Sequence, residues 1–271
     1  MLKQRLIVAI ILLPLGIFLI HMDGWFLAGF ILLLVGLAAW EYTQLFRAAG
    51  FQPSPLWVIA GATLLVVGRA INGFESAPWI IGLIVLASMA HHLFAYERGR
   101  DQAGTDFTIT LAGALYLGWL GAYLLSLRAL PDGEWWFLTA MSGVWLADSG
   151  AFFIGRRFGK HKLSPRLSPK KTWEGYFGGV VIGMLGGALF GSFWGLGAPG
   201  SAISWFSGGV LGLLMGVLTP LGDLGESMIK RQAGQKDSGT LLPGHGGAFD
   251  RIDSWIWAGT IGYYVIVWFF I

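Results

Sequence analysis

The chain contains no cysteine. Disulfide bridges, zinc sites with cysteine ligands and thiol nucleophiles are therefore excluded. Charge is also scarce, because Asp, Glu, Lys and Arg together make up 12% of the 271 residues. A soluble domain of this length carries about 25% charged residues, so the composition points away from a soluble protein.

Several catalytic motifs are missing as well. The sequence shows no HExxH pair of zinc-binding histidines and no Ser-His-Asp arrangement. The segment GRRFGKH, residues 155–161, is not a phosphate-binding P-loop, because its glycines have the wrong spacing and a histidine follows the lysine. No internal repeat is obvious, and the two halves lack the inverted symmetry that many transporters carry. Zinc proteases, serine hydrolases and P-loop enzymes are therefore disfavoured.

Apolar sequence dominates the chain, with 55% hydrophobic residues and a mean hydropathy of +0.65. Most of the 42 glycines lie inside apolar runs, where small residues let helices pack closely in lipid. A helix needs about 20 apolar residues to cross a bilayer. We therefore predict an all-α, polytopic membrane protein with about nine transmembrane helices. The predicted spans are residues 5–21, 24–46, 56–71, 77–95, 107–129, 135–155, 175–196, 205–229 and 253–271.

The basic residues predict the orientation of these spans. The first run has no signal-peptide cleavage site before Asp23, so we interpret it as a membrane helix. If the N-terminus is cytoplasmic, all of the 18 Lys and Arg residues except Arg69 and Arg128 fall at the cytoplasmic face. This bias follows the positive-inside rule and predicts a cytoplasmic N-terminus. The net charge of +3 then belongs to a membrane face and does not indicate a nucleic-acid site.

Two cytoplasmic loops, residues 156–174 and 231–252, stand out from the short connections elsewhere. Both lie in the second half of the chain; the first is rich in Lys and Arg, and the second combines Lys and Arg with several glycines. We therefore predict that residues 131–271 form the catalytic region. The helices of residues 1–130 are predicted to be a scaffold or a dimer interface.

Acidic residues lie at the cytoplasmic ends of the last two spans. Asp223 lies about two helical turns inside Arg231, and a carboxylate at membrane depth normally faces a cavity and has a partner. Asp250 and Asp253 stand three residues apart at the start of the last span, where they could simply stabilise the helix N-terminus. Alternatively, Asp223 and Asp250 converge on a divalent cation such as magnesium. Asp253 would then hold a second ion or orient Arg251.

The loop between these acids is suited to phosphate. Its basic side chains can grip phosphate oxygens, and its glycines let backbone N–H groups approach an anion. His245 could donate to a phosphate or shuttle a proton, or it could be an ordinary loop histidine. The positive charge of cytoplasmic loops alone explains part of the basic cluster. The basic residues are Lys230, Arg231, Lys236 and Arg251, and the glycines are Gly239, Gly244, Gly246 and Gly247.

The earlier loop carries Lys170 and Lys171 at the start of the seventh span, where a helix N-terminus favours an anion. Glu174 could be a capping-box partner at this helix start. Asp148, about two turns inside Arg156, is another acid at membrane depth. Together the two loops predict a cytoplasm-facing site for phosphoryl or nucleotidyl transfer to a molecule in the bilayer.

Residues 227–253, SMIKRQAGQKDSGTLLPGHGGAFDRID, closely resemble the signature of the phosphatidate cytidylyltransferases, also called CDP-diacylglycerol synthases. The segments around Asp148 and SPKKTWEG, residues 168–175, also look like elements of this family. Ala248 departs from it, because a larger apolar residue is usual there, and this difference concerns packing. The matching signature residues are Ser227, Lys230, Arg231, Lys236, Asp237, Pro243, His245, Gly246, Gly247, Asp250, Arg251 and Asp253.

The resemblance implies a reaction of CTP with phosphatidate that gives CDP-diacylglycerol and pyrophosphate for phospholipid biosynthesis. It also implies magnesium, with potassium as a second ion, and a homodimer in the inner membrane whose active site faces the cytoplasm. No nucleic-acid partner is expected. The implied catalytic residues are Asp223, Lys230, Arg231, Lys236, Asp237, His245, Asp250, Arg251 and Asp253. The resemblance implies magnesium at Asp223 and Asp250, and Asp253 is predicted as a further metal ligand from its position at the helix start. The implied substrate-binding residues are Asp148, Lys170, Lys171, Ser227, Gly246 and Gly247.

Two other functions fit the same residue types. A CTP-dependent kinase of a polyprenol-type lipid alcohol would transfer the γ-phosphoryl group and release CDP. A transporter of a phosphorylated solute would use a similar basic cavity without turning over a nucleotide. The missing repeat symmetry and the clustering of acids at one face disfavour the transporter.

Overall fold

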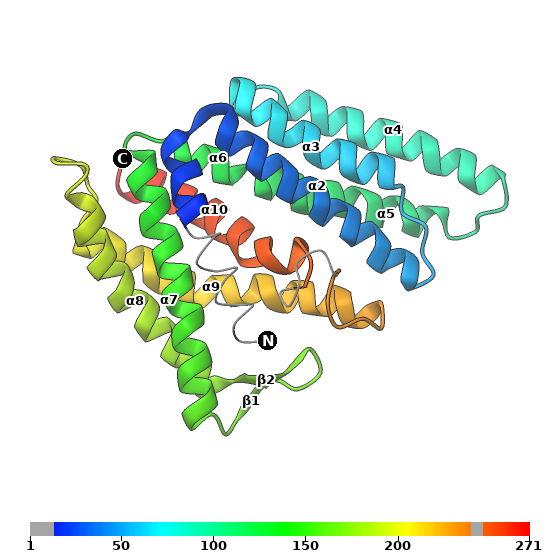
Figure 1. Cartoon of the computed structure of the whole chain (residues 1–271). Helices are drawn as coiled ribbons and strands as arrows, with labels where there is room; N and C mark the ends of the chain where they lie inside the picture. Colours follow the sequence, from blue (N-terminus) through cyan, green and yellow to red (C-terminus); the bar gives the residue numbers. More distant parts are fainter. Residues whose placement is uncertain (1–13, 240–245) are drawn as a thin grey trace. The chain divides into compact units, whose positions relative to one another are not determined.

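The computed structural model describes residues 14–239 and 246–271 and is mostly helical (Figure 1). Residues 14–22 are helical, and Asp23 separates them from the first of the longer helices. The helices that follow are α2 (Gly24–Ala48), α3 (Pro55–Asn72), α4 (Ala77–Glu97), α5 (Ala103–Gly113), the π-helical segment η1 (Ala114–Trp119), α6 (Tyr123–Arg128), α7 (Gly133–Phe158), α8 (Trp173–Gly195), α9 (Trp205–Gln232) and α10 (Phe249–Phe269). The only strands of the described residues are β1 (Lys162–Ser164) and β2 (Ser168–Thr172).

Seven helices of the described part are long and apolar enough to cross a membrane. They are α2, α3, α4, the continuous helix of residues Ala103–Arg128, α7, α8 and α9. The prediction of an all-α, polytopic membrane protein is thus confirmed. Helix α10 is long enough to be the last predicted span but is not among the seven. The predicted span 5–21 lies mostly outside the described residues, so the count of nine and the cytoplasmic N-terminus stay predictions.

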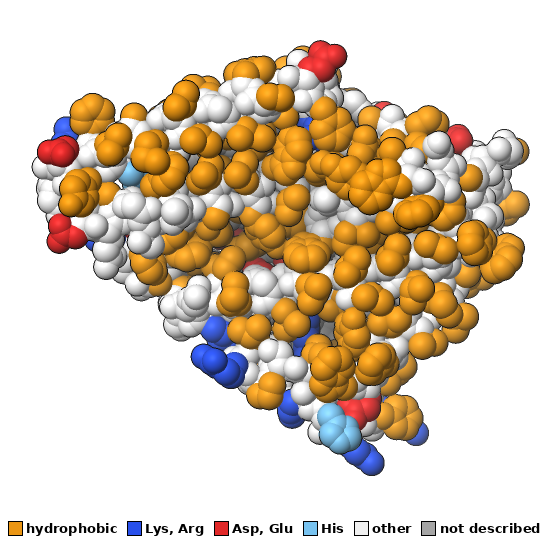
Figure 2. All heavy atoms as spheres, turned by 180° about the vertical axis from the view of Figure 1, so that it is seen from behind, with side chains coloured by type: hydrophobic (Ala, Val, Ile, Leu, Met, Phe, Trp, Pro, Cys, Tyr) orange, Lys and Arg blue, Asp and Glu red, His pale blue; other side chains and the backbone are white. Residues whose placement is uncertain are grey.

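Large hydrophobic side chains stand on the outside of these helices. Phe94, Leu189 and Trp268 each leave about two thirds of their surface exposed. Figure 2 shows hydrophobic side chains spread over most of the visible face, with few charged side chains among them. Exposed apolar surface of this extent marks contact with a membrane. The chain is a multi-pass membrane protein.

The chain divides into two compact units. The first unit comprises Met1–Leu125 and Ile229–Ile252, and the second comprises Ser126–Met228 and Asp253–Ile271. Residues Ile229–Ile252, which include most of the predicted signature, therefore belong to the same unit as the N-terminal helices. The predicted division of roles between residues 1–130 and 131–271 stays a prediction.

In the first unit, α2 packs against α3, and α3 packs against α4 and η1 (Figure 1). Leu65, Ile80, Ile84 and Ala114 form a buried apolar cluster between them. Gly118 of η1 lies so close to α3 that an added Cβ would come within 2.4 Å of the Cα of Ala62. Only glycine allows this approach of two backbones.

In the second unit, α8 carries a stripe of buried glycines at every fourth residue. This spacing puts them on one helix face, which packs against α7 and α9. A Cβ on Gly187 would lie 2.3 Å from the carbonyl oxygen of Gly208 and 2.9 Å from the Cα of Gly212. Close backbone packing therefore holds this unit together. The stripe is Gly175, Gly179, Gly183, Gly187 and Gly191.

The predicted cytoplasmic loop 156–174 contains the antiparallel β1–β2 hairpin, which connects α7 to α8 (Figure 1). The hydroxyl of Thr172 caps α8 by accepting from the N–H of Gly175 at 3.2 Å. Glu174 is not the capping-box partner that we expected. Its carboxylate instead accepts from the N–H groups of Lys160 and His161 and from His161 Nδ1, and so ties the end of α7 to the start of α8. Thr172 is the N-cap, so Glu174 stands one residue too early for a capping box.

Candidate functional site

A cavity of about 590 Å³ opens in the second unit where α7, β2, α8 and α9 meet. Its volume falls within the range of about 300–1,000 Å³ that is typical of small-molecule sites. The ionisable residues that line it are Asp148, Arg156, Lys170, Lys171, Tyr176 and Asp223. The structure therefore brings together four predicted site residues, Asp148, Lys170, Lys171 and Asp223, which come from three separate stretches of sequence.

Small residues leave room in this cavity. Gly155, Gly175, Gly179 and Gly216 line it and contribute no side chain. Pro220, inside α9, lines it too and has no N–H, so the carbonyl of Gly216 cannot receive its usual helical hydrogen bond from residue 220. A ligand in this cavity can therefore approach exposed backbone groups as well as the charged side chains.

The carboxylate of Asp223 stands half open to solvent in this cavity. Its Oδ2 pairs with Nζ of Lys171 at 2.7 Å, and the Asp223 side chain remains 40% exposed. The hydroxyl of Ser227 lies 3.4 Å from Oδ1, a weak contact. Exposed ion pairs contribute little stability. Lys171 can therefore leave Asp223 to bind a phosphate, and Asp223 can bind a cation, at a small cost in folding free energy.

Arg156 was not among the predicted site residues, although its spacing from Asp148 indicates a shared helix face. Asp148, Phe152 and Arg156 follow one another at intervals of four on α7, and all three line the cavity. Residues at this spacing share a helix face. Tyr176 was missed as well, and its hydroxyl donates to the carbonyl of Val217 at 3.0 Å, which joins α8 to α9 beside the cavity.

A second polar cluster lies in the first unit and surrounds Asp250. Its Oδ1 accepts from Nζ of Lys230 at 2.5 Å. Its Oδ2 accepts from the N–H and the hydroxyl of Ser238 at 2.9 and 2.7 Å, and from the N–H of Gly247 at 2.9 Å. The side chain of Asp250 is only 8% exposed. Four donors thus hold this buried carboxylate in one position.

The donors also set the ionisation of Asp250. Burial raises the pKa of its carboxyl, but the hydrogen bonds from Lys230, Gly247 and Ser238 outweigh burial and lower this pKa to about 2. Asp250 is therefore a carboxylate at neutral pH.

Glu41 of α2 belongs to the same cluster and was not among the predicted site residues. Its fully buried carboxylate accepts from the N–H groups of Ala248 and Phe249 at 3.0 and 2.9 Å. It also accepts from the hydroxyl of Ser238 at 2.9 Å. The signal was present, because a lone carboxylate inside the apolar run 24–46 requires polar partners.

The other predicted site residues differ in burial. Lys230 and Ser227 are buried, each with 8% of its surface exposed, and Asp253 is 7% exposed with Oδ1 accepting from the N–H of Ser254. Gly246 has a φ of 80°, a left-handed conformation that favours glycine. Four residues are exposed, namely Arg231, Lys236, Asp237 and Arg251. His245 and Gly244 lie outside the described residues, as does Pro243.

Within the described residues, no group of three or more His, Asp or Glu side chains could hold a metal ion. Magnesium does not require such a group, because it is usually bound by one or two carboxylates together with substrate phosphates and water. Asp148 and Asp223 line one cavity and are accessible from it, so their oxygens fit this ion. The carboxylate of Asp250 is less available to magnesium in this conformation, because its Oδ2 already accepts three hydrogen bonds.

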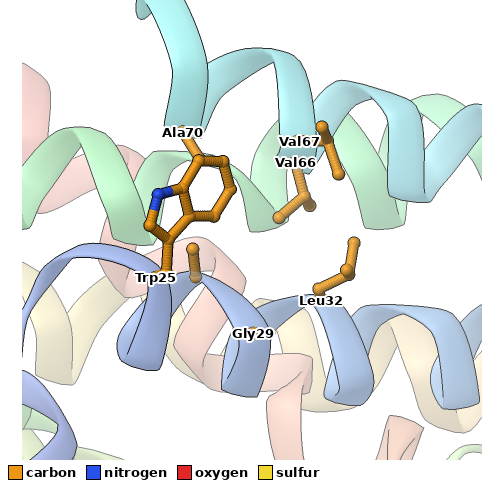
Figure 3. A pocket seen from close by; sticks show the side chains of 7 residues that line it. Trp25, Gly29, Leu32, Val66, Val67 and Ala70 are labelled. Atoms are coloured by element: carbon orange, nitrogen blue, oxygen red, sulfur yellow. The ribbon is translucent and has the colours of Figure 1, made fainter.

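A further cavity, in the first unit, has a different character. It measures about 50 Å³ and lies between α2 and α3 (Figure 3). It contains no charged group that could bind a phosphate. The residues that line it are Trp25, Ala28, Gly29, Leu32, Val66, Val67 and Ala70.

Comparison with known proteins agrees with the resemblance of the signature. The profile of the Cytidylyltransferase family matches residues 3–269. A phosphatidate cytidylyltransferase of Pseudomonas aeruginosa is 39% identical, over 94% of this chain and 93% of the relative. The proteins of the same name from Synechocystis sp. and Brucella suis are 33% and 35% identical, over 97% of this chain and 96% and 92% of the relatives. The chain therefore belongs to the cytidylyltransferase family.

Proposed function

We propose that this protein transfers the cytidylyl group of CTP to phosphatidate, giving CDP-diacylglycerol and pyrophosphate for phospholipid biosynthesis. The observation that carries the proposal is the cavity of the second unit, in which Arg156, Lys170 and Lys171 stand beside Asp148 and Asp223. A nucleotidyl transfer needs basic side chains that bind the phosphates and carboxylates that bind a metal ion. Family membership and the names of the relatives support this choice of reaction.

The proposed reaction is an in-line displacement at phosphorus. An oxygen of the phosphatidate phosphate forms a bond to the α-phosphorus of CTP, and the bond from that phosphorus to the bridging oxygen of pyrophosphate breaks. Phosphatidate is already anionic near neutral pH, so the protein does not need a strong general base. Its contribution is to position the two substrates and to neutralise their charge.

The basic side chains divide into two groups by location. Arg156, Lys170 and Lys171 line the cavity of the second unit and are proposed to bind the triphosphate. The lysines and arginines predicted from the signature are proposed contacts for the triphosphate, the leaving pyrophosphate or the lipid phosphate. They are Lys230, Arg231, Lys236 and Arg251, with Ser227, Asp237, His245, Gly246 and Gly247 as further substrate or catalytic contacts.

Magnesium is the proposed cofactor, with potassium as a second ion. Asp223 would hold magnesium, and Asp148 is accessible from the same cavity. The resemblance adds Asp250 as a proposed ligand, and Asp253, at the same helix start, is proposed to hold a second ion or to orient Arg251. When bound, magnesium neutralises charge on the phosphate oxygens and favours departure of pyrophosphate.

The proposed setting is the inner membrane, with a homodimer whose active site faces the cytoplasm. The support is the positive-inside pattern of the sequence, because loops 156–174 and 231–252 carry most of the Lys and Arg residues. No nucleic acid is proposed as a partner.

The test uses purified protein in detergent micelles that contain phosphatidate. CTP labelled at the α-phosphorus is added with and without magnesium, and the label is followed into the lipid extract. Magnesium-dependent label in the lipid is the expected result. Label recovered in water as CDP would instead identify a lipid kinase, and intact CTP with folded protein would contradict both enzymatic readings.

A further inference from the structure

Glu41 is completely buried and lies within an apolar membrane helix. A charged group in that position is expensive unless hydrogen bonds compensate for its lost hydration. The three donors around it come from residues about 200 positions later in the chain, Ser238, Ala248 and Phe249. The carboxylate therefore joins α2 to the segment that leads into α10.

Two of these donors belong to a helix start. Helix α10 begins at Phe249, and the first N–H groups of a helix have no partner within the helix itself. Glu41 accepts from the N–H groups of Ala248 and Phe249 and thus caps α10 from outside. A negative charge at a helix N-terminus is also favoured by the helix dipole. Asp250 follows in the same first turn, so its position depends on this cap.

The third donor connects Glu41 to Asp250 directly. The hydroxyl of Ser238 lies 2.9 Å from Oε2 of Glu41 and 2.7 Å from Oδ2 of Asp250. A hydroxyl has one proton, so it can donate fully to only one of the two carboxylates at a time. Ser238 thus couples the two carboxylates.

Glycines permit this arrangement. A Cβ on Gly247 would lie 2.2 Å from Oε2 of Glu41, and a Cβ on Gly239 would lie 2.5 Å from Oε1. Any side chain at either position would displace the carboxylate or the loop. These two glycines are therefore needed for the approach of an anion, and in the structure that anion is Glu41.

We infer that Glu41 is a positioning residue for the proposed reaction. It caps α10 and shares the hydroxyl of Ser238 with Asp250, and so holds the Asp250 carboxylate in the orientation that the reaction requires. Glu41 touches no substrate in this scheme and acts through Asp250. The inference rests on the proposed function for its kinetic consequence, but its structural part can be measured on protein without substrate.

The first measurement is hydrogen–deuterium exchange on full-length wild type and Glu41→Gln. Gln keeps the length of Glu but offers one oxygen instead of two, so one amide of residues 248–249 loses its acceptor. We expect about tenfold faster exchange in peptides that cover residues 246–252, the order of effect of one lost hydrogen bond to a charged group. Glu97→Gln, at the exposed end of α4, is the matched control and should leave this exchange unchanged.

The second measurement is steady-state kinetics with CTP, magnesium and phosphatidate in micelles. Partners that orient a ligating carboxylate typically change activity or metal affinity about 10- to 100-fold. We expect a loss of this size in kcat/KM for Glu41→Gln, with a higher magnesium concentration at half-maximal activity, and a larger loss for Glu41→Ala. Mere loss of folded protein would lower the apparent kcat and leave KM and the magnesium requirement unchanged.

A double-mutant cycle tests the route through Ser238. If Glu41 acts partly through this hydroxyl, the losses in Glu41→Gln and Ser238→Ala should combine to less than their product. Unchanged exchange at residues 246–252, or wild-type KM and magnesium dependence in Glu41→Gln, would overturn the inference. An inactive wild-type protein would instead contradict the proposed function, and the exchange result would still decide whether Glu41 holds the start of α10.

Discussion

Asp250 in the first unit and Asp223 in the second were predicted as equivalent metal ligands, yet their surroundings differ. Asp250 is 8% exposed and accepts four hydrogen bonds, from Lys230, Ser238 and Gly247. Asp223 is 40% exposed, pairs with Lys171 and borders a cavity of about 590 Å³. The carboxylate of Asp250 is therefore occupied by hydrogen bonds within the protein, whereas the carboxylate of Asp223 remains open to a ligand.

The largest expected effect is that of Asp223→Asn. Removing a carboxylate that binds a catalytic cation loses several kcal/mol of transition-state stabilisation, so kcat/KM should fall about 1,000-fold. The thermal unfolding temperature should stay close to that of wild type, because the Lys171–Asp223 pair is exposed. Asp101→Asn, at an exposed position, is the control. Activity near wild type would remove Asp223 from the site.

Asp250→Asn should differ from Asp223→Asn in stability. It removes the charged partner that Asp250 provides for the buried Lys230, which costs about 3 kcal/mol of unfolding free energy. Thermal or denaturant unfolding in detergent would measure this loss. Adding Lys230→Met to Asp250→Asn should restore part of the stability, since the buried positive charge is then gone. An unfolding midpoint equal to that of wild type in Asp250→Asn would contradict the tight pairing.

Gly187→Ala tests whether the open cavity depends on the close packing of its unit. The added methyl would collide with the backbone of α9, and overpacking of this kind costs about 1–3 kcal/mol. We expect a lower unfolding midpoint, accompanied by weaker CTP binding if the cavity deforms. Gly209→Ala is the matched control, because its Cβ would meet only an ordinary contact at 3.5 Å. Equal midpoints for the two variants would show that α8 and α9 pack less closely than described.

The smallest expected effect is that of Arg156→Lys. Lysine keeps the charge but not the planar fork that binds two phosphate oxygens. We expect the KM for CTP to rise about tenfold, with little change in kcat, as for a contact made equally to substrate and transition state. Arg157→Lys, one residue further along α7 and absent from the cavity wall, should behave as wild type. A large fall in kcat would assign Arg156 to the transition state.

The membrane character, and four of the residues that line the cavity of the second unit, could be predicted from sequence because they depend on local order. The length of each apolar run sets each span, and seven such helices are present among the described residues. Lys170, Lys171 and Asp148 were predicted as site residues from their position near the ends of apolar runs, and all three line the cavity of the second unit. Charge and periodicity are properties of neighbouring residues, so no tertiary information was required to find them.

The partners of those residues depended on folding. Nothing in the sequence near Glu41 indicates that it caps a helix that begins at Phe249. This contact forms only when α2 packs beside the start of α10. For the same reason the glycines of loop 231–252 were assigned to phosphate, although Gly239 and Gly247 lie against Glu41. Local sequence specifies helices and charges, whereas the free energy of burying a carboxylate is recovered only from donors that the packed chain brings to it.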